Sequence, residues 1–281
     1  MAERLRRPCF LRLIGLALCL ALCGTVVASA RLTVGNGVGL APGESGEASS
    51  ECPPALEARK GGFSADFGAA GGAEVSGFKM RGRGWRVLAT NTGEEEAGAS
   101  VESYCSPAAP RPLVQRDATV PVPPLTAAAA VVSCRRGETL LSAGFRNSIV
   151  AGGAHVVVDG MRRAGARSIR VSGVNLSPSA RGRLTAYAYC GHARRPLVRS
   201  QTVPVSPLGK ERLVARCPEK ARGFAHRPAL FGGFQAGASD PPAGAVASSA
   251  QFRNFGDRIV ITAVNRDPAA AMSMTAFVYC R

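Results

Sequence analysis

The stretch Leu184-Thr-Ala-Tyr-Ala-Tyr-Cys190 decides the fold, because it is an alternating strand that ends on a cysteine and has two counterparts in the chain. Residues 274–280 read Met-Thr-Ala-Phe-Val-Tyr-Cys, and residues 100–105 read Ser-Val-Glu-Ser-Tyr-Cys. In the first two stretches, the cysteine shares one strand face with small or aliphatic residues, and aromatic residues occupy the other face. We therefore expect a buried disulfide at the end of each strand, and tyrosines that pack with their hydroxyl groups near water.

The rest of the pattern recurs with the same period. The opening cysteines, Cys52, Cys134 and Cys217, are 82 and 83 residues apart. Each is followed by a Gly-Phe step and by an apolar run that ends in asparagine: Gly62-Phe63 and Asn91, Gly144-Phe145 and Asn175, Gly233-Phe234 and Asn265. Such a period predicts a tandem array. We predict an all-β chain of three repeats of about 80 residues, each a small antiparallel β-sandwich-like unit closed by a disulfide. The repeats are segment 1 (residues 31–110), segment 2 (111–194) and segment 3 (195–281).

Residues 1–30 have the pattern of a signal peptide. Four arginines precede an apolar run over residues 13–27, and Ala28-Ser-Ala30 is typical of a cleavage site. The run is shorter than the roughly 20 residues that a membrane-spanning helix needs. We therefore expect export, cleavage after Ala30, a secreted or cell-surface location, and no membrane span after cleavage.

Six cysteines remain after cleavage, which favours three disulfides in an oxidising compartment. The repeat favours the pairs Cys52–Cys105, Cys134–Cys190 and Cys217–Cys280. An alternative joins neighbouring segments through Cys105–Cys134 and Cys190–Cys217, with Cys52–Cys280 closing the set, and it stays open at this stage. We expect no metal site, because the closest of these cysteines, Cys190 and Cys217, are 27 residues apart and no Cys-x-x-Cys pair is present.

Two residues that suggest ligands are better explained by the repeat. Trp85 stands six residues before Asn91, where Ile169 and Ile259 stand before their own asparagines, so we expect a core position. Asn175-Leu-Ser is formally a glycosylation sequon, but the recurring asparagines precede turn residues and are expected to cap turns.

Charge is the main guide to partners. The net charge is +16, or +13 once the four Arg and one Glu of residues 1–30 are removed. We expect weak electrostatic binding to an anionic wall polymer or polysaccharide, through charge spread over all three segments with no arginine recurring at one aligned position. Specific nucleic-acid binding is not expected, because interleaved exposed aromatic residues are lacking.

Catalytic and cofactor motifs are lacking. His155, His192 and His226 occupy different places in the repeat, and no nucleophile, base and carboxylate come together in a recognisable spacing. We therefore predict a non-catalytic protein without a cofactor. The alternative is a secreted enzyme with a loop-built site in one degenerate repeat, for which the sequence offers the following residues of segment 1: Arg81, Arg83, Arg86 and Glu94.

The motifs also resemble those of a known group of proteins. Cys52, Gly61-Gly62-Phe63, Trp85-Arg-Val-Leu-Ala-Thr-Asn91 and Leu184-Thr-Ala-Tyr-Ala-Tyr-Cys190 resemble repeats in exported, function-unassigned proteins of high-GC Gram-positive bacteria. The resemblance covers almost all of the chain after residue 30. It implies export and a repeated fold, and it implies no activity, because the shared motifs are structural. The end of segment 1 and Ala143, which replaces the first glycine of the doublet in segment 2, depart from the pattern.

Overall fold

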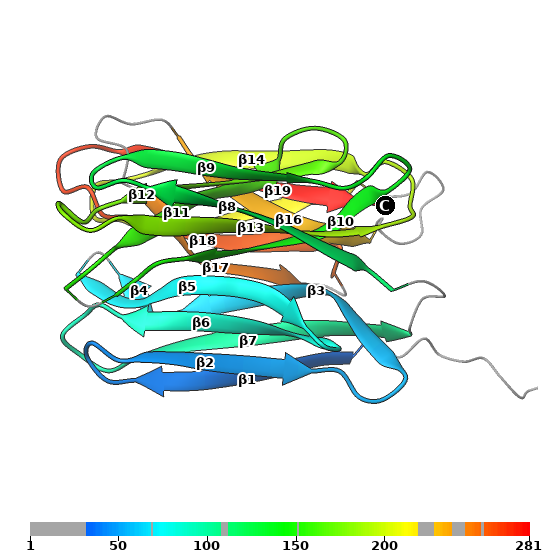
Figure 1. The fold of residues 1–281 in the computed structure, drawn as a ribbon, viewed down its shortest axis with the longest axis horizontal. Coiled ribbons are helices and arrows are strands. Elements are labelled where there is room, and N and C mark those ends of the chain that lie inside the picture. Colours follow the sequence, from blue (N-terminus) through cyan, green and yellow to red (C-terminus); the bar gives the residue numbers. More distant parts are fainter. Residues whose placement is uncertain are drawn as a thin grey trace, which may run out of the picture. The chain divides into compact units, whose positions relative to one another are not determined.

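The computed structural model describes residues 32–68, 70–107, 112–150, 152–218, 228–237, 245–253 and 256–281. These ranges consist of β-strands joined by turns and loops, and they contain no α-helix (Figure 1), so the all-β prediction is confirmed. The expected signal peptide and His226 lie outside the described residues. Within those ranges, no helix is long and apolar enough to cross a membrane.

The strands form three sheets in which every neighbouring pair is antiparallel. The first sheet has the order β1 (Leu32–Leu40), β7 (Ala97–Pro107), β3 (Leu56–Ala65), β17 (Ala245–Arg253), β18 (Arg258–Asn265) and β15 (Lys210–Arg216). The second has the order β2 (Ser45–Glu51), β6 (Gly84–Asn91), β5 (Gly71–Arg81), β10 (Thr139–Asn147), β13 (Gly182–Gly191) and β8 (Val114–Val122), with β4 (Phe67–Gly68) paired to β5. The third has the order β14 (Leu197–Val205), β19 (Met272–Cys280), β16 (Ala229–Ala236), β11 (Val156–Arg163), β12 (Ser168–Asn175) and β9 (Ala127–Ser133).

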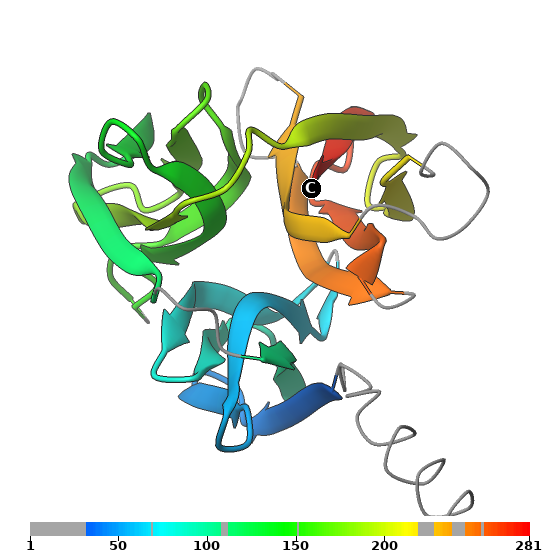
Figure 2. The ribbon, with the colours of Figure 1, turned by 90° about the vertical axis from the view of Figure 1, so that its right-hand side faces the viewer.

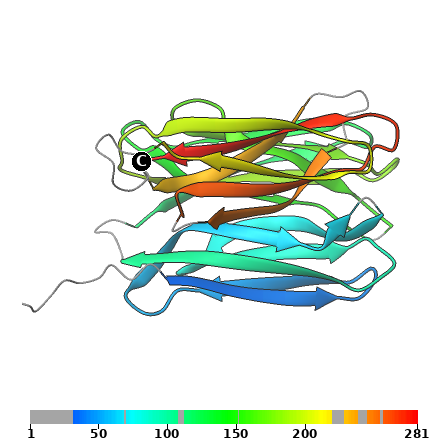
Figure 3. The same cartoon turned by 180° about the vertical axis from the view of Figure 1, so that it is seen from behind.

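Each sheet combines strands from two of the three segments. The junctions are β10 with β5, β16 with β11, and β3 with β17, so segments 1 and 2, 2 and 3, and 3 and 1 are joined in turn. Figure 2 shows the segments as three groups of strands, and Figure 3 shows orange strands of segment 3 beside cyan strands of segment 1. Pairing across the junctions satisfies backbone groups that would otherwise form exposed sheet edges.

The Gly-Phe steps lie at these junctions. A Cβ atom on the glycine would stand 2.2–2.9 Å from a carbonyl oxygen of the neighbouring segment's strand, so a larger residue would hold the two strands apart. The pairs are Gly62 with Ala250, Gly144 with Phe78, and Gly233 with Met161. The phenylalanines that follow are buried in one core cluster with residues of all three segments. The glycine therefore allows close approach, and the phenylalanine fills the shared core.

The tyrosines before the closing cysteines bind across the same junctions. The hydroxyl oxygen of Tyr189 accepts the N–H of Met80 at 2.7 Å, and that of Tyr279 accepts the N–H of Arg163 at 2.9 Å. Tyr104 accepts the N–H of Phe252 at 3.0 Å in the same way. The expectation that the hydroxyl groups of Tyr189 and Tyr279 lie near water is wrong, because both side chains are 2% exposed and their hydroxyl groups bond a neighbouring backbone.

The six cysteines form disulfides within the segments, and Trp85 lies in the core. Disulfides join Cys52 to Cys105, Cys134 to Cys190 and Cys217 to Cys280, which are the pairs that the repeat favoured over the inter-segment alternative. Trp85 is 1% exposed and its ring stacks on Phe78 with centroids 4.5 Å apart. The prediction that it is a core residue is confirmed.

The recurring asparagines are buried and fix the turns that follow them. Asn175 donates from Nδ2 to the carbonyl oxygens of Val122 and Ala180, and its Oδ1 accepts the N–H of Ser177. Asn91 and Asn265 make the corresponding three kinds of bond. Turn capping is therefore confirmed. Because Asn175 is 0% exposed and its amide is fully engaged, the folded protein cannot carry a glycan on it.

Candidate functional sites

The three disulfides lie at one end of the strands, which we call the disulfide end. Cys52 N–H donates to the carbonyl of Arg83 in the turn between β5 and β6, and Cys134 N–H donates to that of Arg167 between β11 and β12. At each junction, one strand begins after the opening cysteine of its segment; these strands are β3, β10 and β16. Each runs antiparallel to a strand of the neighbouring segment that ends at such a turn, namely β17, β5 and β11 in the same order. The register therefore brings the disulfides of neighbouring segments, and the turns beside them, to the same end.

Exposed arginines from all three segments gather at the disulfide end. They are Arg83, Arg135, Arg136, Arg167, Arg216 and Arg281. None of the six has a carboxylate partner among the described residues. Of the nearby acidic groups, Glu57 pairs with Arg59 and Asp257 is buried, which leaves Glu51 as an exposed carboxylate of this region. The six guanidinium groups therefore make no ion pair with a described carboxylate, although Glu51 and Glu138 lie in the same region.

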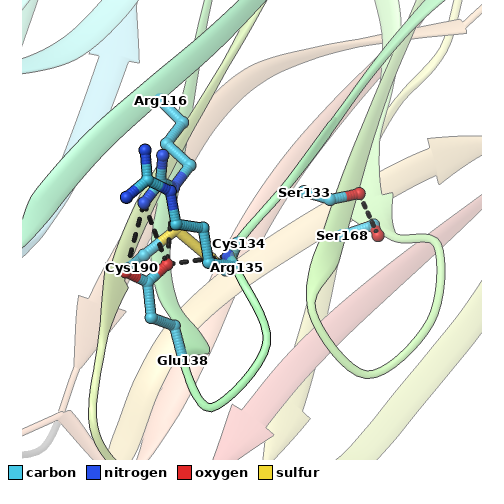
Figure 4. The surroundings of a disulfide bond; sticks show 7 residues. All are labelled: Arg116, Ser133, Cys134, Arg135, Glu138, Ser168 and Cys190. Carbon is cyan, nitrogen blue, oxygen red and sulfur yellow. Dashed lines mark hydrogen bonds and ion pairs between the residues drawn. A yellow bond between two sulfur atoms is a disulfide. The ribbon is translucent and has the colours of Figure 1, made fainter.

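The surroundings of the Cys134–Cys190 disulfide show how the local acid, Glu138, is bound (Figure 4). Glu138 accepts the backbone N–H of Arg135 at 2.8 Å and pairs with Arg116 at 3.1 Å. The bond from Arg116 lowers the pKa of Glu138 below its ordinary value of 4.5, so the carboxylate is ionised and already engaged. Cys134, Glu138 and Cys190 have the spacing of a metal site, but both sulfurs are joined in the disulfide and offer no thiolate.

One part of the expectation about charge needs correction, because an arginine does recur at an aligned position. Arg83 and Arg167 occupy the same place in segments 1 and 2, since each accepts the N–H of its segment's opening cysteine, and Asp257 takes that place in segment 3. Counting back from the asparagines shows this match, since Arg83, Arg167 and Asp257 each stand eight residues before the asparagine of their own segment. The signal was therefore present in the sequence, and the prediction that no arginine recurs at one aligned position is wrong.

The four residues proposed for an enzymatic site do not come together. Arg81 and Arg86 both pair with Glu47, at 3.3 and 2.9 Å, on the outer side of the second sheet. Arg83 belongs to the disulfide end, whereas exposed Glu94 follows Asn91 at the opposite end of β6. Sequence reasoning grouped them because they share one segment, and the strand between them separates them.

A polar cluster that sequence reasoning missed joins residues of all three segments. Glu74, which is 6% exposed, lies in β5 beside Ala73, whose partner is Asn91. The same register position is held by Val157 in β11 and Val246 in β17. The missed signal was a glutamate where the other two segments have valine.

Glu74 is held by three side chains. It accepts from His155 Nε2 at 2.8 Å, from Arg266 at 3.0 Å and from Thr92 Oγ1 at 3.0 Å. Burial alone would raise the pKa of Glu74, but the hydrogen bond and charge of His155 and the charge of Arg266 outweigh it, so the pKa lies below 4.5. The ionised carboxylate therefore takes the Nε2 proton of His155 as a hydrogen bond.

His155 and Arg266 also line an open cavity of about 640 Å³. A hydrolytic site would also need a nucleophile beside the histidine. Thr92 bonds the carboxylate itself, and Ser177, which lines the cavity, binds the N–H of Ala180 through its hydroxyl oxygen. The described contacts are those of a polar link that ties the Glu74 carboxylate of segment 1 to side chains of segments 2 and 3.

Comparison of the chain with protein-family models and with curated proteins finds no match. The functional conclusion is therefore drawn from the residues of the two candidate sites.

Proposed function

We propose that this chain is an exported, non-catalytic protein of three repeats that binds acidic polymers through the arginines of the disulfide end. The observation that carries the proposal is the group of six exposed arginines from all three segments, none of which forms an ion pair with a carboxylate in the part of the chain that the structure describes. The anionic wall polymers and polysaccharides outside a cell have the charge that such a cluster attracts.

The chemistry of arginine suits this role. A guanidinium group offers up to five N–H donors and binds carboxylate, sulfate or phosphate groups through paired hydrogen bonds. Several weak contacts along one polymer add through avidity, without any single deep site. Exposed charges are screened beyond about 8 Å at physiological ionic strength, so binding should weaken steeply as salt rises. Nucleic acid would be held by charge alone, since Trp85 and Tyr189 are buried and cannot stack on bases.

Export and repetition support the same proposal. The pattern of residues 1–30 is that of a signal peptide, and three disulfides are typical of proteins outside the cytosol. Without β4, each segment has six described strands, and the three sheets share one strand order. In every sheet, the first, last and third strands of one segment are followed by the fourth, fifth and second strands of another, as in β1-β7-β3-β17-β18-β15. Repetition multiplies the turns and loops beside the disulfides, and with them the places where arginine can be displayed.

The test compares two variants of equal charge on a heparin-type polyanion matrix. In the first, Arg83, Arg135, Arg136 and Arg167 are all replaced by glutamine. In the control, four exposed cations of the other end are replaced in the same way: Arg181, Arg183, Lys210 and Arg212. We expect the first variant to elute at clearly lower salt than the control. Equal elution of both would show that only net charge matters, and unchanged elution of the first would refute the site.

A further inference from the structure

Three hairpin turns lie at the end opposite the disulfides, where the buried asparagines are, and we call this the asparagine end. Their central residues are Pro42-Gly43, Pro124-Leu125 and Pro207-Leu208. The second residue has a φ of 75° for Gly43, 52° for Leu125 and 51° for Leu208. Proline followed by a positive φ defines a type II turn, which favours glycine or asparagine at the second position. Leucine in this conformation brings its Cβ too close to a neighbouring carbonyl oxygen.

Neither leucine side chain is buried, so no packing within the fold offsets this strain. Leu125 is 68% exposed and Leu208 is 51% exposed. Their backbones are fixed, because Leu125 N–H donates to the carbonyl of Ser177 and Leu208 N–H donates to that of Asp267. Gly43 makes the same kind of bond to Asn91 in segment 1, so the turn forms without leucine. A strained residue that does not stabilise the fold suggests a functional role, such as contact with another molecule.

We propose that Leu125 and Leu208 insert into the interface of an anionic lipid bilayer and dock the asparagine end on it. Two single leucines on separate rigid turns suit a bilayer, which accepts isolated apolar side chains without a matching groove. Val150, which is 59% exposed, lies in a loop that lines the same cavity as Asn91 and Ser177, and adds a third apolar side chain at this end.

The charges around the turns agree with an anionic surface. Exposed Arg181 and Lys210 lie close in sequence to the residues that form the two leucine turns, and cations at a membrane surface are attracted by anionic lipid headgroups. Most of the acidic residues of this end accompany the glycine turn: Glu44, Glu94, Glu95 and Glu96 are all exposed in segment 1, whereas segment 3 has exposed Glu211 beside Lys210 and half-buried Asp267 at the Leu208 turn. Cations therefore outnumber acids around the leucine turns, where exposed Arg181, Arg183, Lys210 and Arg212 stand against Glu211 and Asp267, and acids predominate around the glycine turn. The docking face therefore belongs to segments 2 and 3.

The test uses the chain from residue 31, made with its disulfides, and sedimentation with vesicles of phosphatidylglycerol and phosphatidylcholine. The variant Leu125→Asn with Leu208→Asn keeps the net charge, so attraction of the arginines to the vesicles is unchanged. We expect its partitioning to fall at least about 10-fold, since two buried leucine side chains are lost from the bilayer. We also expect an equal or higher Tm, because asparagine tolerates the left-handed conformation.

Two further variants separate insertion from other causes. The control Val131→Asn with Val198→Asn removes two valines that are 45% and 46% exposed and lie in strands, and it should partition like the unchanged protein. Phenylalanine at both leucine positions should keep vesicle binding, because a bilayer does not demand the shape of leucine. Unchanged partitioning of the asparagine variant, an equal loss in the valine control, or no vesicle binding by the unchanged protein would overturn the proposal, and any of these would leave a protein groove as the reason for the leucines.

Discussion

Replacement of Tyr189 or Tyr279 by phenylalanine should measure how much the junctions contribute to stability. Each substitution removes one hydroxyl oxygen and leaves the aromatic ring in place. In the unchanged protein, Tyr279 stacks on Phe231 with centroids 4.3 Å apart, and Tyr189 meets Trp85 edge to face at 5.4 Å. Phenylalanine keeps both ring contacts, so the variants isolate the hydrogen bond to the neighbouring segment.

The expected loss of stability follows from the backbone N–H group that each substitution leaves without an acceptor. The N–H groups of Met80 and Arg163 lie beside tyrosines that are 2% exposed, so water cannot readily replace the lost acceptor. A buried donor without a partner costs about 1–3 kcal/mol. In a protein of this size, that corresponds to a fall in Tm of roughly 2–12 °C. Because the two sites belong to different junctions, their effects should add, to about 2–6 kcal/mol for the double variant.

The assay is denaturant and thermal unfolding with the disulfides intact, with Tyr187→Phe as the matched control. Tyr187 accepts and donates no hydrogen bond within the described residues, and Lys79 contacts its ring at 5.2 Å, which phenylalanine preserves. The control should change stability by less than about 0.5 kcal/mol. If the junction variants cost no more than the control, the hydroxyl bonds do not hold the segments together. Separate unfolding transitions for the segments in the unchanged protein would also refute a shared core.

The same tyrosines predict alkaline sensitivity. Burial raises the pKa of Tyr279 to about 12 and also raises that of Tyr189 above its ordinary value of 10.0. A group whose pKa is raised on folding stabilises the protein below its unfolded pKa, and the contribution is lost as pH rises from that value through the folded one. The free energy of unfolding should therefore fall from about pH 10 upward, and less steeply in the double phenylalanine variant. Equal slopes in both proteins would show that these hydroxyl groups do not control the titration.

Three further outcomes are expected. Trp85→Ala should lower the free energy of unfolding by about 3–5 kcal/mol, measured with urea, while elution from the polyanion matrix stays the same; salt-resistant binding to one glycan that the folded variant loses would contradict the core assignment. Gly144→Ala should cost about 1–3 kcal/mol, because its Cβ would stand 2.2 Å from the carbonyl oxygen of Phe78, whereas Gly39→Ala has open space and should not; equal effects would contradict the close approach. The pKa of Glu74 is lowered on folding, so its contribution is present above pH 4.5 and is lost as pH falls below that value. Glu74→Val introduces the residue that segments 2 and 3 have at the equivalent position. It should make the free energy of unfolding depend less on pH between about pH 3 and 5, and an unchanged pH dependence would refute the role of this carboxylate.

Much of the fold could be predicted from the sequence because local patterns determine it. The alternation around Trp85 predicted that this residue is buried. The asparagines followed by turn residues predicted where β6, β12 and β18 end. Both features depend on neighbours in the chain and on the period of two. The cysteine period favoured disulfides within each segment over those between segments, and these are the pairs that form.

What could not be predicted depends on pairing between segments. A glycine before phenylalanine does not show whose backbone approaches it, and the strand that approaches Gly144 is 66 residues earlier, at Phe78. The hydroxyl of Tyr189 was assigned to water for the same reason, since its acceptor role needs Met80 from another segment. The arginine cluster and the Glu74 link likewise exist only once distant segments meet, and neither has a local motif.

The order of the junctions has a consequence for how such a chain could be built from separate pieces. Each segment presents its third strand to one neighbour and its fourth strand to the other, so the contact is heterologous and runs head to tail. It returns to its starting point after three steps, because β3 of segment 1 pairs with β17 of segment 3. A single segment made alone would carry two free edges that complement each other on different molecules. Three copies could then form a cyclic homotrimer in which the covalent linkers at residues 110 and 194 are dispensable and the symmetry is exact rather than approximate.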